Sequence, residues 1–132
     1  MIKGVGHLGI IVKDMEKSLK ALSQVIEFEK PAIKEFPDKK MRCALVETKG
    51  VALEFIQDNS HDGPMAQFRG GKEDVLHHFC LVSDDIEEDV EALKKRGVEM
   101  LDQKPRIGLR GKKIAMTMPS ALNGITIELS EP

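Results

Sequence analysis

The stretch HFCLVSDDIEEDVEAL, residues 78–93, aligns without a gap on HLGIIVKDMEKSLKAL, residues 7–22. The offset is constant (78 − 7 = 71), and it places Asp14 on Asp85. Each copy begins with an apolar run, reaches an aspartate and continues with apolar residues spaced as on one face of a helix. This pattern predicts a strand followed by a helix, written twice.

A second pair of segments repeats in the same order. GVALEF, residues 50–55, matches GITIEL, residues 124–129, and places Glu54 on Glu128 (128 − 54 = 74). One match of this length can arise by chance. Two matches in the same order and at nearly equal offsets indicate a duplicated structural unit.

The helix boundaries follow from capping residues. Asp14 is placed to cap a helix over residues 15–27, with its apolar residues on one stripe. In the second copy, Asp85 and Glu88 form a pair like a capping box in which Asp replaces Ser or Thr. That second helix is expected to end near Gly97.

The remaining strands complete each copy. KMRCALVET and VALEFIQ predict a hairpin around Lys49-Gly50, and KKIAMTM and ITIEL predict its equivalent in the second half. We therefore predict an α+β fold made of two paired βαβββ modules, about 1–57 and 75–132, joined by a loop over 58–74. The modules form a single domain, with a curved, incompletely closed mixed sheet around a cleft.

Chemically useful side chains occupy equivalent places in the two copies. A histidine opens the first strand of each half and a glutamate lies in its last strand. A pseudo-twofold packing of the modules would bring four of them into one cleft: His7, Glu54, His78 and Glu128. A lone strand histidine is more often a packed core or edge residue, but four repeat-related positions favour ligands. Two imidazoles and two carboxylates suit one divalent transition metal, with two octahedral positions left open.

Two histidines are adjacent at the start of the second copy, and only one of them can face the cleft, since neighbouring strand residues point to opposite faces. His78 is the counterpart of His7 and is predicted to face inward, whereas His77 is predicted to point away. Cys80 shares a face with His78, so it either fills the core or approaches the metal.

Composition excludes several classes of function. The chain has 132 residues, of which 41% are hydrophobic and 32% charged, with a net charge of −2, as in an ordinary globular protein. This balance predicts no attraction to nucleic acid or membrane. No apolar run approaches the roughly 20 residues needed to cross a bilayer. The two cysteines make no disulfide framework, so a cytoplasmic location is expected.

The segment KPRIGLRGKK holds five basic residues in ten. It is either a solvated loop or a binding site for phosphate groups. The candidate phosphate-binding residues are Arg106, Arg110, Lys112 and Lys113.

Over essentially its whole length the chain resembles the vicinal oxygen chelate superfamily and, within it, the methylmalonyl-CoA epimerases. The resemblance is carried by HLGIIVKDMEKSL, LHHFCLVSDDIE, KPRIGLRGKKIAM and NGITIEL. It implies paired βαβββ modules, commonly a homodimer, and one divalent ion per chain. The ligands that it implies are again His7, Glu54, His78 and Glu128, and they suit cobalt, zinc, nickel or manganese.

The resemblance also implies an activity, the epimerisation of methylmalonyl-CoA or a similar acyl-CoA thioester by removal and return of a proton through an enolate. Inversion requires two acid/base groups, for which the family pattern indicates Glu128 and Asp38; the latter stands where relatives usually carry Glu. We expect the pKa values of these two carboxyl groups to lie nearer neutrality than usual. The basic segment would then bind the CoA phosphates.

Two other functions use the same fold. A glyoxalase I-type lactoylglutathione lyase uses the same His/Glu/His/Glu set, but its substrate carries no phosphate. The basic segment therefore favours the CoA thioester. A non-catalytic ligand-binding protein is the other alternative, and four potential ligands argue against a metal-free form of it.

Overall fold

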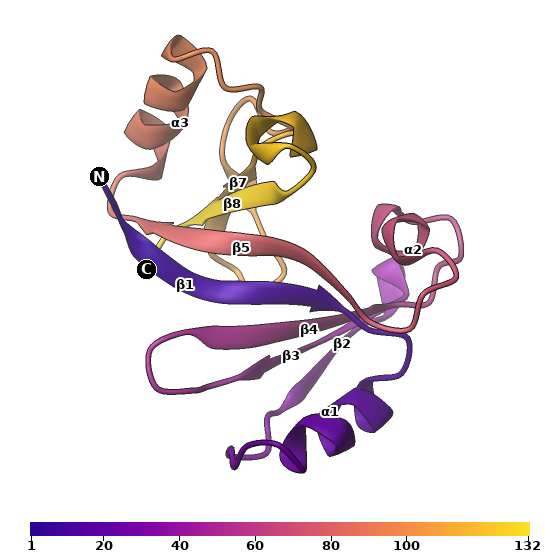
Figure 1. The fold of residues 1–132 in the computed structure, drawn as a ribbon. Coiled ribbons are helices and arrows are strands. Elements are labelled where there is room, and N and C mark those ends of the chain that lie inside the picture. The colour runs from indigo at the N-terminus through magenta and orange to yellow at the C-terminus, as the bar shows by residue number, and fades with distance from the viewer. The chain divides into compact units, whose positions relative to one another are not determined.

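The computed structural model describes residues 1–132 and contains eight strands, three α-helices and two 3-10 turns. In chain order these are β1 (Ile2–Ile11), α1 (Met15–Ser23), β2 (Ile33–Phe36), η1 (Pro37–Lys39), β3 (Met41–Val46), β4 (Ala52–Asp58), α2 (Pro64–Arg69), β5 (Val75–Ser83), α3 (Ile86–Lys95), β6 (Arg106–Ile107), β7 (Lys113–Met116), η2 (Pro119–Leu122) and β8 (Thr126–Ser130) (Figure 1). A strand, a helix and three further strands follow one another twice. The predicted α+β repeat is therefore confirmed.

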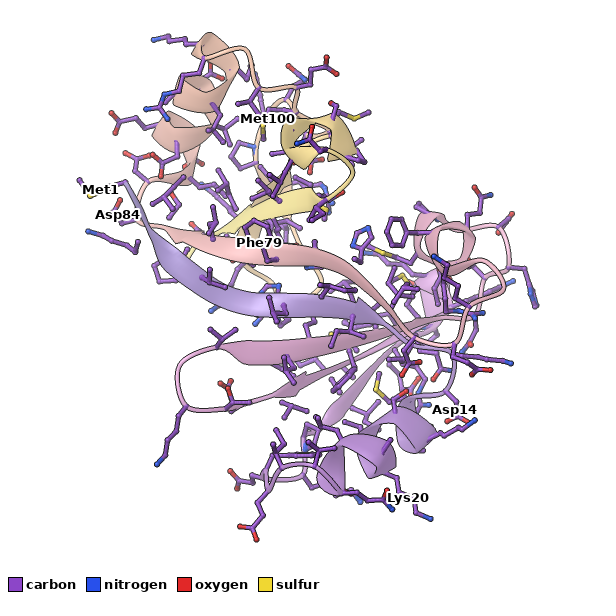
Figure 2. The ribbon with its side chains drawn as sticks, in the orientation of Figure 1. Met1, Asp14, Lys20, Phe79, Asp84 and Met100 are labelled. Carbon is purple, nitrogen blue, oxygen red and sulfur yellow. The ribbon has the colours of Figure 1, made fainter.

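Backbone contacts divide the chain into two compact units. Unit 2 consists of residues 8–77, and unit 1 consists of residues 1–7 together with 78–132. The first residues thus belong with the second half of the sequence. An ion pair ties them there, because the Met1 ammonium lies 2.6 Å from the Asp84 Oδ1 (Figure 2). The predicted boundaries of the two modules stay a prediction.

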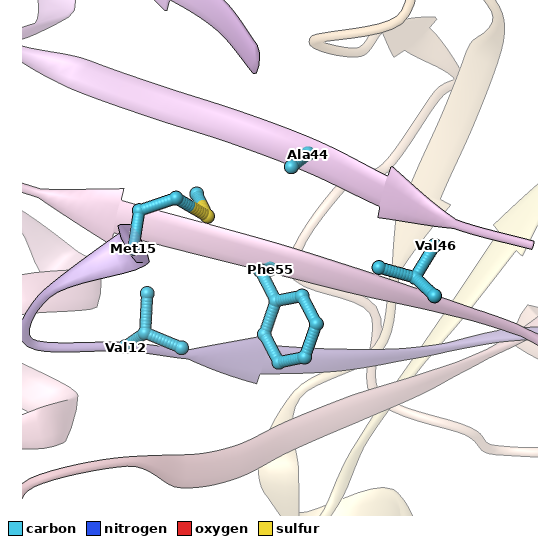
Figure 3. Packing of buried hydrophobic residues seen from close by; sticks show 5 residues of the cluster. All are labelled: Val12, Met15, Ala44, Val46 and Phe55. Carbon is cyan, nitrogen blue, oxygen red and sulfur yellow. The ribbon is translucent and has the colours of Figure 1, made fainter. Parts of the chain in front are cut away.

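In unit 2 the strands lie in the order β2-β3-β4-β1, and β3 pairs antiparallel with both β2 and β4. The predicted hairpin around Gly50 is the β3–β4 hairpin, where this glycine has φ +102°. The core of the unit is a cluster contributed by the residue that follows β1 and by α1, β3 and β4 (Figure 3). Its buried members are Val12, Met15, Ala44, Val46 and Phe55.

Helix α1 begins where the sequence predicts. The Asp14 side chain accepts a hydrogen bond from the Lys17 backbone N–H at 3.1 Å and caps the helix (Figure 2). The predicted end at residue 27 is wrong, since the helix ends at Ser23. The next apolar residues, Val25 and Ile26, are exposed, so a further helical turn would not be stabilised by packing.

In unit 1 the strands lie in the order β1-β5-β8-β7-β6. β8 pairs parallel with β5 and antiparallel with β7. The core beneath α3 consists of Ile86, Val90, Met100, Ala115 and Leu129. Helix α3 is capped as predicted, because Asp85 accepts from the Glu88 N–H at 3.1 Å and Gly97 follows the helix at φ +86°.

None of the three helices has the length and apolar character required to cross a bilayer.

Candidate metal centre

Strand alternation separates the two adjacent histidines of β5. His78 is only 1% exposed, and Cys80 is buried on the same face two residues later. His77 directly precedes His78 in the strand, so its side chain points to the opposite face. It is half-buried and belongs to unit 2. There its ring packs edge-on against Phe68 of α2, with 4.6 Å between ring centroids. The two imidazoles therefore lie in different environments.

Three of the predicted ligands meet inside unit 1. They come from three neighbouring strands, His7 from β1, His78 from β5 and Glu128 from β8. The His7 Nε2 lies 3.3 Å from both the His78 Nε2 and the Glu128 Oε1, and the His78 Nε2 lies 3.6 Å from the Glu128 Oε2. The exposed fractions of the three residues are 3%, 1% and 6%. The structure thus gathers two imidazoles and a carboxylate in a buried cluster.

The spacing of these donor atoms fits a divalent metal. With metal–ligand distances of about 2.1 Å, neighbouring donors lie about 3.0 Å apart in an octahedron and about 3.4 Å apart in a tetrahedron. The three observed separations, 3.3, 3.3 and 3.6 Å, are close to these values. Cys80 faces Glu128 in the β5–β8 register, and its sulfur lies within 4.8 Å of ligand atoms of His7 and Glu128. The cluster could therefore hold a metal ion through two nitrogens and a carboxylate, with a thiol nearby.

The charge state of Glu128 departs from the sequence expectation. Burial by itself raises the pKa of this carboxyl group. The hydrogen bond from His7, the electrostatic effect of His78 and His7 and the hydrogen bond with Cys80 together outweigh burial, so the pKa lies below its ordinary value. The expectation of a pKa nearer neutrality is wrong for Glu128, because the partners of the carboxylate decide the sign.

The basic segment of the sequence does not form a single cluster of cations. The Arg106 Nε donates to the Asp102 Oδ1 at 2.9 Å, and the Lys113 Nζ lies 2.6 Å from the Glu87 Oε1. Lys112 is exposed at the end of the turn between β6 and β7. These three basic residues lie on the surface or at its edge, where two of them already pair with acids.

Arg110 departs from this pattern and reaches the metal cluster. Its Nη2 lies 3.0 Å from the His7 Nδ1, on the side of the ring opposite to the donor atom that faces Glu128. The turn that carries Arg110 is closed by a hydrogen bond from the Gly111 N–H to the Gly108 carbonyl oxygen, with Gly111 at φ +80°. The sequence alone groups Arg110 with the other basic residues of its segment, because nothing local connects it to a residue near the start of the chain.

Two predicted site residues lie in unit 2. Glu54 is 6% exposed in β4, in register with Leu45, and the Cys43 sulfur lies 4.0 Å from its Oε2. Asp38 lies in η1 between β2 and β3 and is exposed. The metal-binding role of Glu54 and the catalytic role of Asp38 stay predictions.

Comparison with known proteins identifies the family. The model of the Glyoxalase/Bleomycin resistance protein/Dioxygenase superfamily matches residues 6–116 of the chain. The chain belongs to this superfamily. The predicted family is therefore confirmed, and the match takes in His7, His78, Glu54 and Arg110 and ends before Glu128.

The sequence identity to individual relatives is low. An uncharacterised protein of Bacillus subtilis (strain 168), YqjC, is 30% identical over 126 residues, covering 96% of this chain and 90% of that protein. The mitochondrial methylmalonyl-CoA epimerase of Bos taurus is 26% identical over 128 residues, covering 96% and 73%. Among solved structures, a variant of the Streptomyces coelicolor methylmalonyl-CoA epimerase in complex with 2-nitronate-propionyl-CoA superimposes with a TM-score of 0.86 at 20% identity, covering 99% and 98%. The last similarity shows the fold.

Proposed function

We propose that the chain is a metal-dependent epimerase that inverts the carbon next to the thioester of methylmalonyl-CoA or of a similar acyl-CoA. The observation that carries this proposal is the buried cluster of His7, His78 and Glu128 in unit 1. The similarity to methylmalonyl-CoA epimerases, one of them in complex with a CoA thioester, supports this choice of substrate.

The proposed cofactor is one divalent ion per chain, either cobalt, zinc, nickel or manganese. His7, His78 and Glu128 would hold it, and the sequence repeat predicts Glu54 as a fourth ligand. When bound, such an ion would stabilise the negative charge that develops on the thioester oxygen as the α proton leaves. Without that stabilisation the proton is too weakly acidic to be removed at neutral pH.

Proton transfer is the part of the reaction that falls to the chain's own carboxylates. Glu128 is ionised at neutral pH because its pKa is lowered, so it is in the form that can accept a proton. Inversion also requires a group that returns a proton to the opposite face of the carbon, and Asp38 is our candidate for it. Asp38 is exposed in η1, where it can exchange protons with water.

Substrate binding is assigned to the basic segment. Arg106, Lys112 and Lys113 are proposed to contact the CoA phosphates, since each can donate to phosphate oxygens. Arg106 and Lys113 would exchange their present partners Asp102 and Glu87 for the more highly charged phosphates. We further propose that the protein acts in the cytoplasm as a homodimer.

The test is α-proton exchange. A panel of acyl-CoAs, with methylmalonyl-CoA first, is incubated with metal-loaded protein in heavy water, and deuterium at the α carbon is measured by mass spectrometry. The proposal expects deuterium incorporation together with inversion, and loss of both in Glu128→Gln. Exchange of no acyl-CoA, combined with turnover of the hemithioacetal of methylglyoxal and glutathione, would instead identify a lactoylglutathione lyase.

A further inference from the structure

Unit 2 contains a cavity that the proposed metal centre does not use. It has a volume of about 500 Å³ and is lined by residues that follow β1, by the end of β4 with the loop after it, and by α2, which packs against β4. All of the lining residues fall within 8–77, so His7, His78 and Glu128 are not among them. Cavities that bind small molecules commonly have volumes of about 300–1,000 Å³. The cavity is therefore large enough for a small ligand.

Two basic side chains line the cavity. Arg69, at the end of α2, donates a hydrogen bond to the backbone carbonyl oxygen of Lys72, a neutral group that does not compensate its positive charge. The Lys13 Nζ lies 3.6 Å from the Glu73 Oε1, and both of these side chains are exposed. That separation exceeds the roughly 2.8 Å typical of a charge-assisted hydrogen bond. An anion with more charge than a carboxylate can therefore compete for Lys13 and compensate Arg69.

The acidic side chain in the lining is held by the backbone. The Asp58 Oδ1 accepts a hydrogen bond from the Ser60 N–H at 2.9 Å, and its Oδ2 accepts from the Ala66 N–H at 3.1 Å. These donors offset the negative charge and fix the loop between β4 and α2. With histidine counted as neutral, two basic side chains and one carboxylate give the lining a net charge of +1 (2 − 1). The cavity therefore favours an anion.

His61 lines the cavity from a backbone conformation that favours glycine. Its φ is +68°, in the left-handed region. Hydrogen bonds of the same loop hold it there, since the Gly63 N–H donates to the Ser60 Oγ at 2.8 Å and the Ser60 N–H donates to Asp58. Strained positions of this kind cluster at functional sites. Glycine would adopt this φ at no steric cost, so a histidine is accounted for if its imidazole donates a hydrogen bond into the cavity.

A further donor comes from Asn59, because its Oδ1 accepts from the Gln57 Nε2 at 3.0 Å and its NH₂ group is the part that can bind a ligand. We propose that this cavity binds the phosphate group of a small molecule through Arg69, Lys13, His61 and Asn59. A phosphate monoester carries a charge of about −1.5 to −2 and three acceptor oxygens, and a guanidinium can bind two of them at once.

The volume indicates that the phosphate belongs to a larger molecule. A water molecule occupies about 30 Å³ in the liquid, so a phosphate ion with its five heavy atoms fills only part of about 500 Å³. The remainder would take the organic part of the ligand. This site goes beyond the proposed epimerase activity, and neither requires the other.

The first test measures the binding of AMP, a phosphate monoester, by calorimetry and by ¹H–¹⁵N NMR titration. Arg69→Met should weaken binding by about 10-fold or more, the factor expected for loss of one charge-assisted hydrogen bond. Lys72→Met removes the same charge from a neighbouring residue outside the lining and should stay within about 3-fold of the native protein. Adenosine, which lacks the phosphate, should bind at least about 10-fold more weakly than AMP. Equal affinities of the two variants, or of the two ligands, would overturn the proposal.

The second test uses His61→Gly. This variant should bind AMP about 3-fold or more weakly, while its Tm without ligand stays at or above the native value because glycine relieves the left-handed strain. A purely structural histidine would instead change the Tm and leave the AMP affinity unchanged. That result would overturn the part of the proposal assigned to His61.

The third test separates two sources of the phosphate, a free monoester and the 3′-phosphate of CoA. If CoA occupies the cavity, Arg69→Met should weaken the binding of CoA but not of 3′-dephospho-CoA. If a separate monoester occupies it, both affinities should stay at their native values while AMP affinity falls. The proposed function is tested separately by α-deuteration, which can fail while AMP still binds. Native AMP affinity in Arg69→Met would overturn the phosphate site whatever the outcome for CoA.

Discussion

The most direct prediction compares the two adjacent histidines. His78→Ala removes a donor atom that lies 3.3 Å from the His7 Nε2 and 3.6 Å from the Glu128 Oε2. Changes to groups that merely support a metal ligand lower affinity by about 10- to 100-fold. Loss of the ligand itself should therefore lower zinc affinity by at least about 100-fold, or about 2.7 kcal/mol.

Thermal unfolding converts this affinity into a measurable shift. At a zinc concentration of about 100 times the native Kd, binding adds about 2.7 kcal/mol to the native stability, and a 100-fold weaker site adds only about 0.4 kcal/mol. For a domain of this size, 1 kcal/mol corresponds to about 4 °C in Tm. Zinc should raise the Tm of the native protein by about 10 °C and that of His78→Ala by about 2 °C, as measured by circular dichroism.

His77→Ala is the matched control. It removes the edge-on contact with Phe68, and such contacts contribute about 0.5–1.5 kcal/mol. The Tm without zinc should therefore fall by a few degrees, but the increase on adding zinc should stay at its native value. His78→Leu fills the volume that alanine vacates and should lose the increase as well. If His77→Ala lost the zinc-induced increase and both His78 variants kept it, the assignment of His78 to the metal centre would be refuted.

Four further expectations concern residues outside this pair. Glu54→Ala should weaken zinc binding in calorimetry, and Glu54→Gln should weaken it less because the amide oxygen still offers a lone pair; native affinity in both would remove Glu54 from the ligand set. Asp38→Asn should abolish inversion of methylmalonyl-CoA at unchanged metal content, leaving slow α-deuteration; unaltered inversion would exclude Asp38 as the second base. Lys112→Glu should raise KM for the CoA ester about 3- to 10-fold with little change in kcat, and a constant KM would make its turn a solvated loop. Glu16, whose ordinary pKa of 4.5 is lowered to about 2 by its hydrogen bond with Arg42, stabilises the fold above pH 4.5. Its contribution is lost as the pH falls through 2, so Glu16→Gln should be less stable than the native protein at neutral pH and equally stable near pH 2, and a constant difference would contradict this.

The features that the sequence predicts correctly depend on local pattern. The repeat, the β3–β4 hairpin and the start of each helix follow from alternation, a glycine and the capping residues Asp14 and Asp85. Each of these signals acts within a few residues of the chain. The end of α1 depends instead on whether Val25 and Ile26 find a buried surface, which is a tertiary property. The helix is therefore shorter than its apolar spacing predicts.

The candidate site likewise has some features that the local sequence predicts and others that only the packed fold determines. Strand alternation and the repeat suffice to choose His78 over His77. The predicted direction of the shift in the Glu128 pKa is wrong. An apolar strand indicates that the carboxylate is buried, but it does not indicate how many hydrogen-bond donors surround it. The sequence also does not predict the partners of three basic residues in KPRIGLRGKK, since Asp102, Glu87 and His7 are brought there by the packed fold.

Arg110 and the donor residues of the cluster lie on structural elements of different kinds. The donor atoms of the cluster lie on strands, where the period of two and the β5–β8 register hold each side chain on its face. Arg110 lies on a turn, whose conformation depends on glycines and whose side chain can move without disturbing any ladder of hydrogen bonds. A substitution at Arg110 should therefore leave the three strands that build the cluster intact, whereas a substitution of His7 removes one of its donor atoms.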